Sequence, residues 1–300
     1  SNFPERAEAL AKEIDDKDPA LIGLQEVSLL RTGPGLNPAP ATTVAFDYLQ
    51  ILLDALNARG LRYGVVAVAT DFDAEVPGLF ATGLMDIRLT DRDVILARID
   101  LPLGLLSLSN VQVGNFATSL VVPTLGGGSL TLFRGWASAD VTVKGKMFRL
   151  VTTHLEPLYP PVQVAQANEL LAGPGSTSLP VVFIGDYNSK ADGTGTSTYG
   201  NLIAAGFIDS WTQAHPDDPG YTGEQAADLR NPTSTLSERI DLVLYRPGLE
   251  NNRPATFTVT NAELVGNTPG DKTPSGLWPS DHAGLVVKLN LESPTHGSDD

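Results

Sequence analysis

The fold is indicated first by residues 135–154, which read GWASADVTVKGKMFRLVTTH. Apolar and polar residues alternate over 136–144 and again over 147–153, as they do in strands with one buried face. The sequence KGK at 144–146 separates the two runs, and a glycine at this place favours a tight turn. The stretch therefore predicts a β-hairpin whose second strand leads into His154.

A second stretch, LPVVFIGD at 179–186, is apolar without alternation, which is typical of a strand buried on both faces. The chain has 29 Gly and 22 Pro, so we expect many short elements joined by turns. Further strands are predicted at 20–27, 62–69, 84–89, 93–99, 119–122, 130–133, 240–245, 255–260 and 284–290. Helices are predicted at 5–17, 43–58, 162–171 and 199–205, with a loop at 31–42. We expect one domain over 1–292, with two sheets face to face and helices outside, followed by a polar tail at 293–300.

Composition and charge exclude several classes of protein. The chain has 300 residues, a net charge of −15 and no cysteine. It therefore has no disulfide framework, no thiolate zinc site and no cysteine nucleophile. No apolar run is long enough to span a membrane. Tight binding of polyanions needs clustered Lys and Arg for counterion release, so we expect any nucleic acid to bind weakly. We also expect a monomer.

Several predicted strands end in residues that can bind a metal ion. Carboxylate and amide oxygens with a little imidazole, and no thiol, suit Mg²⁺, Mn²⁺ or Ca²⁺ better than structural zinc. Each residue taken singly has an ordinary explanation, such as a solvated strand end, a hydrogen-bonded structural histidine or an Asx turn. The set is more specific than its members, and it comprises Glu26, His154, Glu156, Asp186, Asn188, Asp241, Asp281 and His282.

In this order the motifs resemble those of the endonuclease/exonuclease/phosphatase superfamily, whose members share the deoxyribonuclease-like fold. The matching segments are LQEV at 24–27, THLE at 153–156, GDYNS at 185–189, RID at 239–241 and SDHAGL at 280–285. The resemblance implies a four-layer α/β/β/α sandwich of two mostly antiparallel sheets, which agrees with the strand pattern.

The resemblance also implies roles for individual residues. Glu26 is similar to the metal-binding glutamate, and Asp281 forms the terminal dyad with His282 and is expected to serve the metal. Asp186 and Asn188 are similar to the pair that contacts the phosphate and orients water or a second metal.

The remaining roles concern the histidines and their partners. Asp241 is similar to the carboxylate that orients His282, and this pair suits a general base. His154 resembles the histidine that contacts a phosphate oxygen and serves as an acid; which histidine is acid and which is base stays open. Asp91 is the candidate acidic partner of His154, and Arg134 resembles the phosphate-binding arginine of the deoxyribonuclease branch.

Two departures from the family pattern affect these expectations. The family begins with a central strand that ends in an asparagine, and nothing before the helix at 5–17 supplies it. We therefore expect a sheet without its first central strand, and infer that the natural protein starts earlier or that this segment was removed. Ser28 stands where nucleases of the branch have an arginine, which argues against binding in a DNA groove.

These observations support a divalent-metal-dependent phosphodiesterase, a nuclease among the candidates, that uses Mg²⁺, Mn²⁺ or Ca²⁺. The alternatives are a sphingomyelinase-like lipid phosphodiesterase and a catalytically silent binding module. Residues 103–131 are uncharged and rich in Gly and Ser, which favours a hairpin over the sheet edge and, as a second interpretation, a lid beside the site. We expect the protein to be secreted, although no signal peptide is visible and the sequence opens at Ser1-Asn2.

Overall fold

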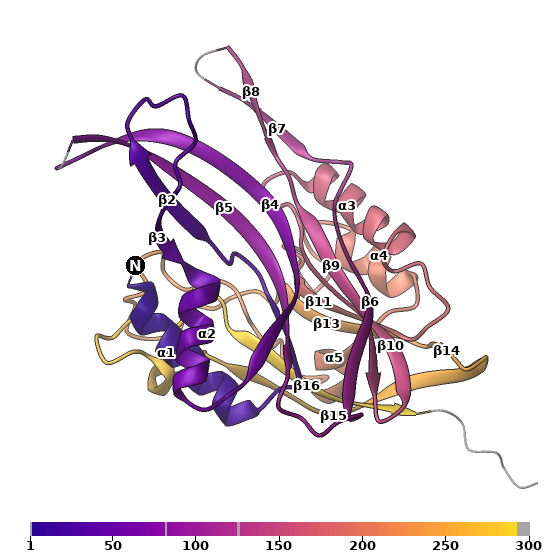
Figure 1. Cartoon of the computed structure of the whole chain (residues 1–300). Helices are drawn as coiled ribbons and strands as arrows, with labels where there is room; N and C mark the ends of the chain where they lie inside the picture. The colour runs from indigo at the N-terminus through magenta and orange to yellow at the C-terminus, as the bar shows by residue number, and fades with distance from the viewer. Residues whose placement is uncertain (1, 82, 125–126, 293–300) are drawn as a thin grey trace, which may run out of the picture.

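A computed structural model describes residues 2–81, 83–124 and 127–292 of the chain. Figure 1 shows two packed layers of β-sheet with helices on both outer faces, which makes a four-layer α/β/β/α sandwich. The polar tail predicted at 293–300 lies outside the described residues. None of the described helices is long and apolar enough to cross a bilayer.

The first sheet layer consists of a five-stranded and a three-stranded sheet. The five-stranded sheet contains β1 (Leu21–Leu24), β2 (Leu29–Pro34), β3 (Thr43–Asp47), β4 (Tyr63–Phe80) and β5 (Gly83–Arg98). The three-stranded sheet contains β14 (Gly248–Glu250), β15 (Arg253–Val265) and β16 (Gly284–Glu292). All pairings within both sheets are antiparallel.

The second sheet layer has six strands in the order β12-β13-β11-β10-β9-β6. They are β6 (Leu106–Asn115), β9 (Gly135–Val143), β10 (Lys146–His154), β11 (Val181–Asp186), β12 (Ile208–Asp209) and β13 (Asp241–Arg246). Residues such as Ile95, Val141 and Phe257 form the apolar core between the two layers. Among the described strands of this sheet, β10 and β11 form the only parallel pair, and this brings their carboxyl ends to the same edge.

Helices cover the outer faces of both layers. α1 (Phe3–Lys17) and α2 (Tyr48–Ala58) pack on the five-stranded sheet, and α3 (Pro160–Ala172) and α4 (Thr198–Ala204) pack on the six-stranded sheet. A short helix, α5 (Ser210–Ala214), and a 3₁₀ turn at Pro269–Asp271 complete the helical elements of the described chain.

The hairpin predicted at 135–154 is confirmed. Val143 pairs with Lys146 at the end of the ladder. Lys144 and Gly145 both have positive φ, at 51° and 80°, as the two central residues of a type I′ turn require. The uncharged stretch at 103–131 contributes the edge strand β6 and a small hairpin of β7 (Leu120–Pro123) and β8 (Ser129–Leu132).

Three local predictions were wrong. The helix predicted from residue 43 begins at Tyr48, because Thr43–Asp47 forms β3 and the Asp47 side chain caps the helix by accepting from Leu49 N. The predicted loop at 31–42 starts within β2, which lies between β3 and β5. The strands predicted at 84–89 and 93–99 are one continuous strand, β5.

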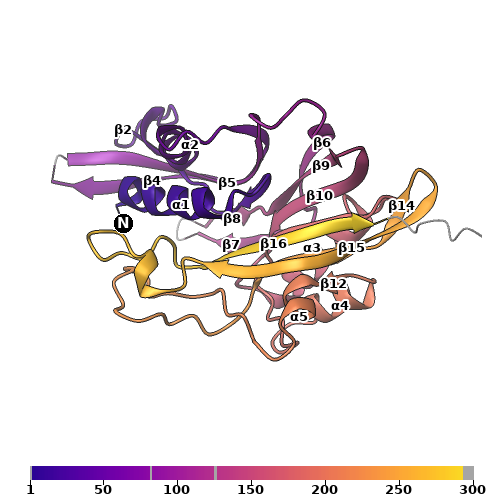
Figure 2. The same ribbon diagram turned by 90° about the horizontal axis from the view of Figure 1, so that it is seen from below.

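The first sheet layer is interrupted, as expected for a sheet that lacks its first central strand. Among the described strands, β1 pairs only with β5 and β16 only with β15, so the five-stranded and three-stranded sheets remain separate. We call this junction, between β1 and the β15–β16 pair, the seam. Figure 2 shows α1 beside the β15–β16 pair. One face of α1 packs on the five-stranded sheet, while Lys17 reaches Glu263 of β15 at 2.7 Å. α1 therefore bridges the seam.

Candidate active site

Three neighbouring strands of the six-stranded sheet place one polar residue each in a row. His154 at the end of β10 pairs with Asp186 at the end of β11, and Asp186 pairs with Asp241 at the start of β13. The row depends on a glycine before Asp186, because Gly185 has a φ of +135° and a Cβ there would lie 2.0 Å from Thr153 O. The sequence therefore aligns these three side chains through strand register alone.

Two further segments, one on each side of the seam, bring their side chains to the same place. Glu26 follows β1, and the loop that precedes β16 carries Asp281 and His282. Burial raises the pKa of Glu26, and the nearby charges of Asp91 and Asp281 raise it further, while Arg134 and His282 oppose the shift. These residues thus concentrate negative charge that a cation would relieve.

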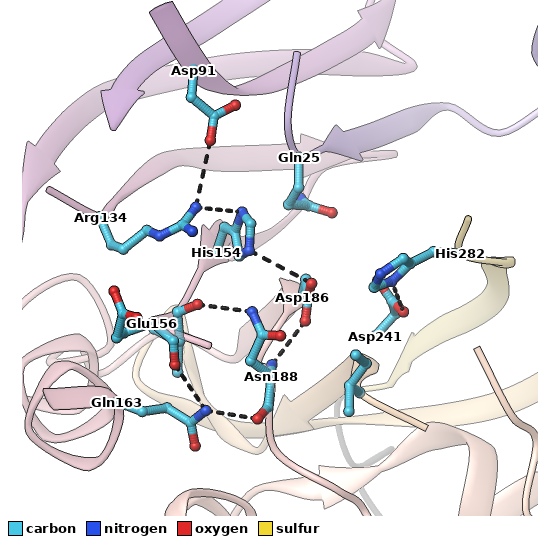
Figure 3. A network of polar contacts seen from close by, with 12 residues as sticks. Gln25, Asp91, Arg134, His154, Glu156, Gln163, Asp186, Asn188, Asp241 and His282 are labelled. Carbon is cyan, nitrogen blue, oxygen red and sulfur yellow. Dashed lines mark hydrogen bonds and ion pairs between the residues drawn. The ribbon is translucent and has the colours of Figure 1, made fainter. Parts of the chain in front are cut away.

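His282 and Asp241 form a close pair, with 2.9 Å between His282 Nδ1 and Asp241 Oδ2 (Figure 3). Burial alone lowers the pKa of His282, but the hydrogen bond to Asp241 and the charges of Asp241, Asp186 and Asp281 outweigh it. The resulting pKa is about 10. Without a cation in the pocket, His282 is therefore an imidazolium at neutral pH and donates to Asp241 through Nδ1.

His154 is buried and held on both sides of its ring. Its Nδ1 lies 2.9 Å from Arg134 Nη1, and its Nε2 lies 3.6 Å from Asp186 Oδ2. A guanidinium can only donate, so Nδ1 accepts and the proton of the neutral ring is on Nε2. Burial, with the charges of Arg134 and His282, lowers the pKa of His154 well below its usual value. His154 is therefore a neutral N–H donor next to Asp186.

Arg134 also lies 3.4 Å from Asp91 Oδ2, so it connects β5 with His154 (Figure 3). On the other side, Asp186 Oδ1 accepts from the backbone N of Asn188 at 2.8 Å. The side chain of Asn188 donates to Leu155 O at 2.9 Å, which fixes the amide beside the carboxylate. These contacts hold two loops together at the carboxyl end of the parallel pair.

The nine residues predicted for the site thus lie in one connected region. Hydrogen bonds, ion pairs or charge interactions connect Glu26, Asp91, Arg134, His154, Asp186, Asn188, Asp241, Asp281 and His282. Oxygen or nitrogen atoms of Asp186, Asp241 and His282 lie within 4.8 Å of one another. The carboxylates of Glu26, Asp281 and Asp186 repel one another, and oxygen ligands of this kind fit a hard divalent cation.

The comparison with protein families agrees with this geometry. The model of the Endonuclease/Exonuclease/phosphatase family matches residues 1–282. The chain belongs to the endonuclease/exonuclease/phosphatase family. Members of this family are phosphoesterase hydrolases and typically depend on divalent metal. No curated protein matches the chain.

Solved structures of the endonuclease/exonuclease/phosphatase family have the same fold. A family protein from Bacteroides vulgatus is 18% identical, with 97% of this chain and 92% of that chain covered and a TM-score of 0.62. D. rerio TDP2 complexed with single strand DNA product is 21% identical, with 97% and 93% covered and a TM-score of 0.60. A mannosyl-6-phosphatase from Bacteroides thetaiotaomicron is 17% identical, with 96% and 91% covered and a TM-score of 0.57.

Two residues beyond the family motifs also hold the site together. Gln163 of α3 donates to Glu156 O at 3.0 Å and to Asn188 O at 2.6 Å, so it fixes both loops of the parallel pair (Figure 3). Arg6 of α1 donates to Pro279 O at 2.8 Å and so contacts the loop that carries His282. No pattern in the sequence marks either residue, because both contacts join distant segments.

Proposed function

We propose that this member of the family is a divalent-metal-dependent phosphodiesterase that uses water for in-line attack on phosphorus. The main support for this proposal is the alignment of His154, Asp186 and Asp241 on neighbouring strands. His282 is hydrogen-bonded to Asp241. This arrangement offers N–H donors, a water-orienting carboxylate and an oriented imidazole within one site. These are the groups that phosphodiester hydrolysis requires.

Glu26 and Asp281 are the residues that would hold the ion, with Asp186 near them. Their fit is supported by the raised pKa of Glu26, which burial and the neighbouring carboxylates cause. When bound, a divalent ion supplies Lewis acidity at a phosphoryl oxygen.

The chain's own residues account for the proton transfers. Asp241 orients His282 through Nδ1, which leaves Nε2 to take the proton from the attacking water. The charges of Asp186 and Asp281 help to raise the pKa of His282, so their neutralisation lowers this pKa towards the range of a base. Asp241 then stabilises the imidazolium that forms.

His154 and Arg134 would contact the phosphate from the other side. His154 donates from Nε2 as a neutral group, and Arg134 brings a positive charge. Both are already oriented before substrate binds, His154 by Arg134 and Arg134 by Asp91, so little reorganisation is required. Asn188 beside Asp186 would position the water.

A lipid phosphodiester is a second candidate substrate, and one observation favours it. The ends of β4 and β5 carry exposed apolar side chains, with Leu79 84%, Phe80 45% and Leu84 44% accessible. Exposed apolar residues in a cluster are typical of contact surfaces for apolar partners. Nucleic acid remains the alternative, since the similar structure of D. rerio TDP2 contains single strand DNA product.

Hydrolysis of bis(p-nitrophenyl) phosphate with Mg²⁺ or Mn²⁺ tests the activity, and parallel assays on plasmid DNA and sphingomyelin test the substrate class. Glu26→Gln should lower turnover by about a hundredfold or more. The exposed Glu8 of α1 provides the matched control, and Glu8→Gln should keep wild-type turnover. Turnover that persists after metal removal, or in Glu26→Gln, would contradict the proposal.

A further inference from the structure

Two aspartates outside the proposed catalytic set lie buried between the sheet layers. Asp93 of β5 points to the same face as Ile95, which belongs to the core between the layers. Asp71 of β4 is the extra residue of a β-bulge, between Thr70 and Phe72 in the pairing with β5. Their exposed fractions are 0% for Asp93 and 1% for Asp71.

No other described residue donates a hydrogen bond to either carboxylate, and all four oxygens of Asp71 and Asp93 are buried. The two side chains lie near enough to share one proton in a hydrogen bond between them. A buried carboxylate without compensation is costly, so the pair requires a proton or a cation. Burial raises the pKa of Asp71 to about 7 and that of Asp93 well above its usual value, in agreement with this demand.

A third ligand is present at the same place. A ring nitrogen of His154 and carboxylate oxygens of both aspartates lie within 4.8 Å of one another. The neighbouring Gly135 permits this position of Asp71, because a Cβ there would lie 2.9 Å from Asp71 Oδ1. Two carboxylates and one imidazole suit Zn²⁺ or Mn²⁺ better than Mg²⁺ or Ca²⁺, which prefer oxygen ligands alone.

The local charge also favours a divalent ion. Asp71, Asp91 and Asp93 all interact with the single guanidinium of Arg134. The single positive charge of Arg134 can neutralise one of these three carboxylates. The two negative charges that are left match the charge of a divalent cation. The Arg134 guanidinium donates hydrogen bonds to Asp91 and His154.

We infer that Asp71, Asp93 and His154 bind a buried Zn²⁺ or Mn²⁺ ion that is distinct from the catalytic ion proposed at Glu26. Binding would use Nδ1 of His154, which carries the lone pair of the neutral ring, so the ion replaces the contact of Nδ1 with Arg134 and Nε2 keeps its proton. Because the ligands are enclosed between the sheets, the ion is taken up as the chain folds and leaves slowly. The inference rests on the buried pair and does not require the proposed activity.

Metal retention after refolding tests this site. The full chain is refolded with Zn²⁺ or Mn²⁺ and dialysed against EDTA, and the retained metal is measured by elemental analysis. One ion per chain should remain in the wild type and in Glu26→Gln, while Asp71→Asn and Asp93→Asn should lose it. Asp140→Asn is the matched control, since Asp140 is also a buried aspartate but is paired with Arg149, and it should keep the ion.

Two outcomes would overturn the inference. A wild-type chain that retains neither ion would show that Asp71 and Asp93 share only a proton, and retention in a folded Asp71→Asn would place the ion elsewhere. If the asparagine variants do not fold, X-ray absorption of zinc-loaded His282→Ala decides, because this variant lacks the imidazole of the other cluster of two aspartates and one histidine. One nitrogen donor together with oxygen donors supports the site, whereas a shell of oxygens alone contradicts it.

Discussion

The protonation of His282 depends on three carboxylates that surround it. Asp241 makes the direct hydrogen bond, and Asp186 and Asp281 act through their charge. Asp241→Asn keeps the shape of the partner but removes its charge. We expect the pKa of His282 in the metal-free protein to fall from about 10 by at least about one unit.

Turnover in Asp241→Asn should fall by about 10² or more, because the oriented base loses the anion that stabilises its charged form. Titration of the histidine signals by NMR measures the pKa, and His215 serves as an internal control in the same spectrum because its ring contacts Ala262 O instead. A pKa that stays near 10 in the variant would show that Asp241 does not set the charge of His282.

Single residues also show what the sequence could predict and what it could not. The motifs place Asp186 and His154 at the ends of predicted strands, and the register of β10 and β11 sets the two residues side by side. The sequence does not mark Asp93 as a site residue, because the polar residues 90–92 predict a break between two strands and Asp93 only begins the second of them. The run continues inside β5 because Arg92 donates to Val27 O at 2.8 Å and Asp93 lies in the interior. Such partners come from distant segments, which no local pattern reveals.

At the scale of elements, the parallel pair of β10 and β11 depends on Gly185. Its φ of +135° is strained for any other residue, and an added Cβ would lie 2.0 Å from Thr153 O. Gly185→Ala should therefore lower the free energy of unfolding by about 3 kcal/mol or more. Gly200, where a Cβ meets nothing within 4 Å, is the matched control, and denaturant unfolding measures both variants. An equal loss of unfolding free energy in the Gly185 and Gly200 variants would show that position 185 is not strained.

Helix α1 carries a second element-scale prediction. Glu13 is largely buried, and its Oε1 has no hydrogen-bond partner. Burial, and then Asp271, raise its pKa from 4.5 to about 8. The folded state therefore favours the protonated form, so the ionisation of Glu13 destabilises the protein increasingly as the pH rises from 4.5 to about 8.

Glu13→Gln should raise the free energy of unfolding by about 2 kcal/mol at pH 8.5 and leave it nearly unchanged at pH 4, after allowance for solvent screening. Thermal or denaturant unfolding at the two pH values measures the difference. A gain of equal size at both pH values would show that packing, not ionisation, is the cause.

Helices and strands were predicted well where the apolar residues follow one spacing, either helical or alternating. They were predicted poorly where the spacing is compatible with both. The hairpin at 135–154 has a clean alternation and a glycine turn, and the structure reproduces it. Residues 43–47 were assigned to a helix because Phe46 continues the helical spacing of Leu49 and Leu53. The strand prevails there because β3 pairs with β2, and Asp47 then caps the helix. Pairing between segments decided what local spacing could not.

At the scale of the whole molecule, the charge of −15 bears on how nucleic acid would bind. Arg134 is the basic residue placed among the site's predicted phosphate contacts, so we expect the protein to neutralise one or two phosphates. The slope of log affinity against log salt for a single-stranded oligonucleotide should then be no steeper than about −2. A fluorescence salt series measures it, with bis(p-nitrophenyl) phosphate turnover as the control that should respond little to salt. A slope near −5 would reveal a basic groove that the described surface does not suggest.

The seam gives the molecule an uneven local stability. Glu26 follows β1 on one side of the seam and His282 precedes β16 on the other, and no pairing among the described strands joins the two sheets. Backbone amides of β1 and β16 should therefore exchange with deuterium sooner than those of β10 and β11, which are paired on both sides. An ion bound by both Glu26 and Asp281 would connect the segments on the two sides of the seam. The free-energy cost of ordering these segments would then reduce the affinity for the ion. Metal binding should slow hydrogen exchange of the β1 and β16 amides together.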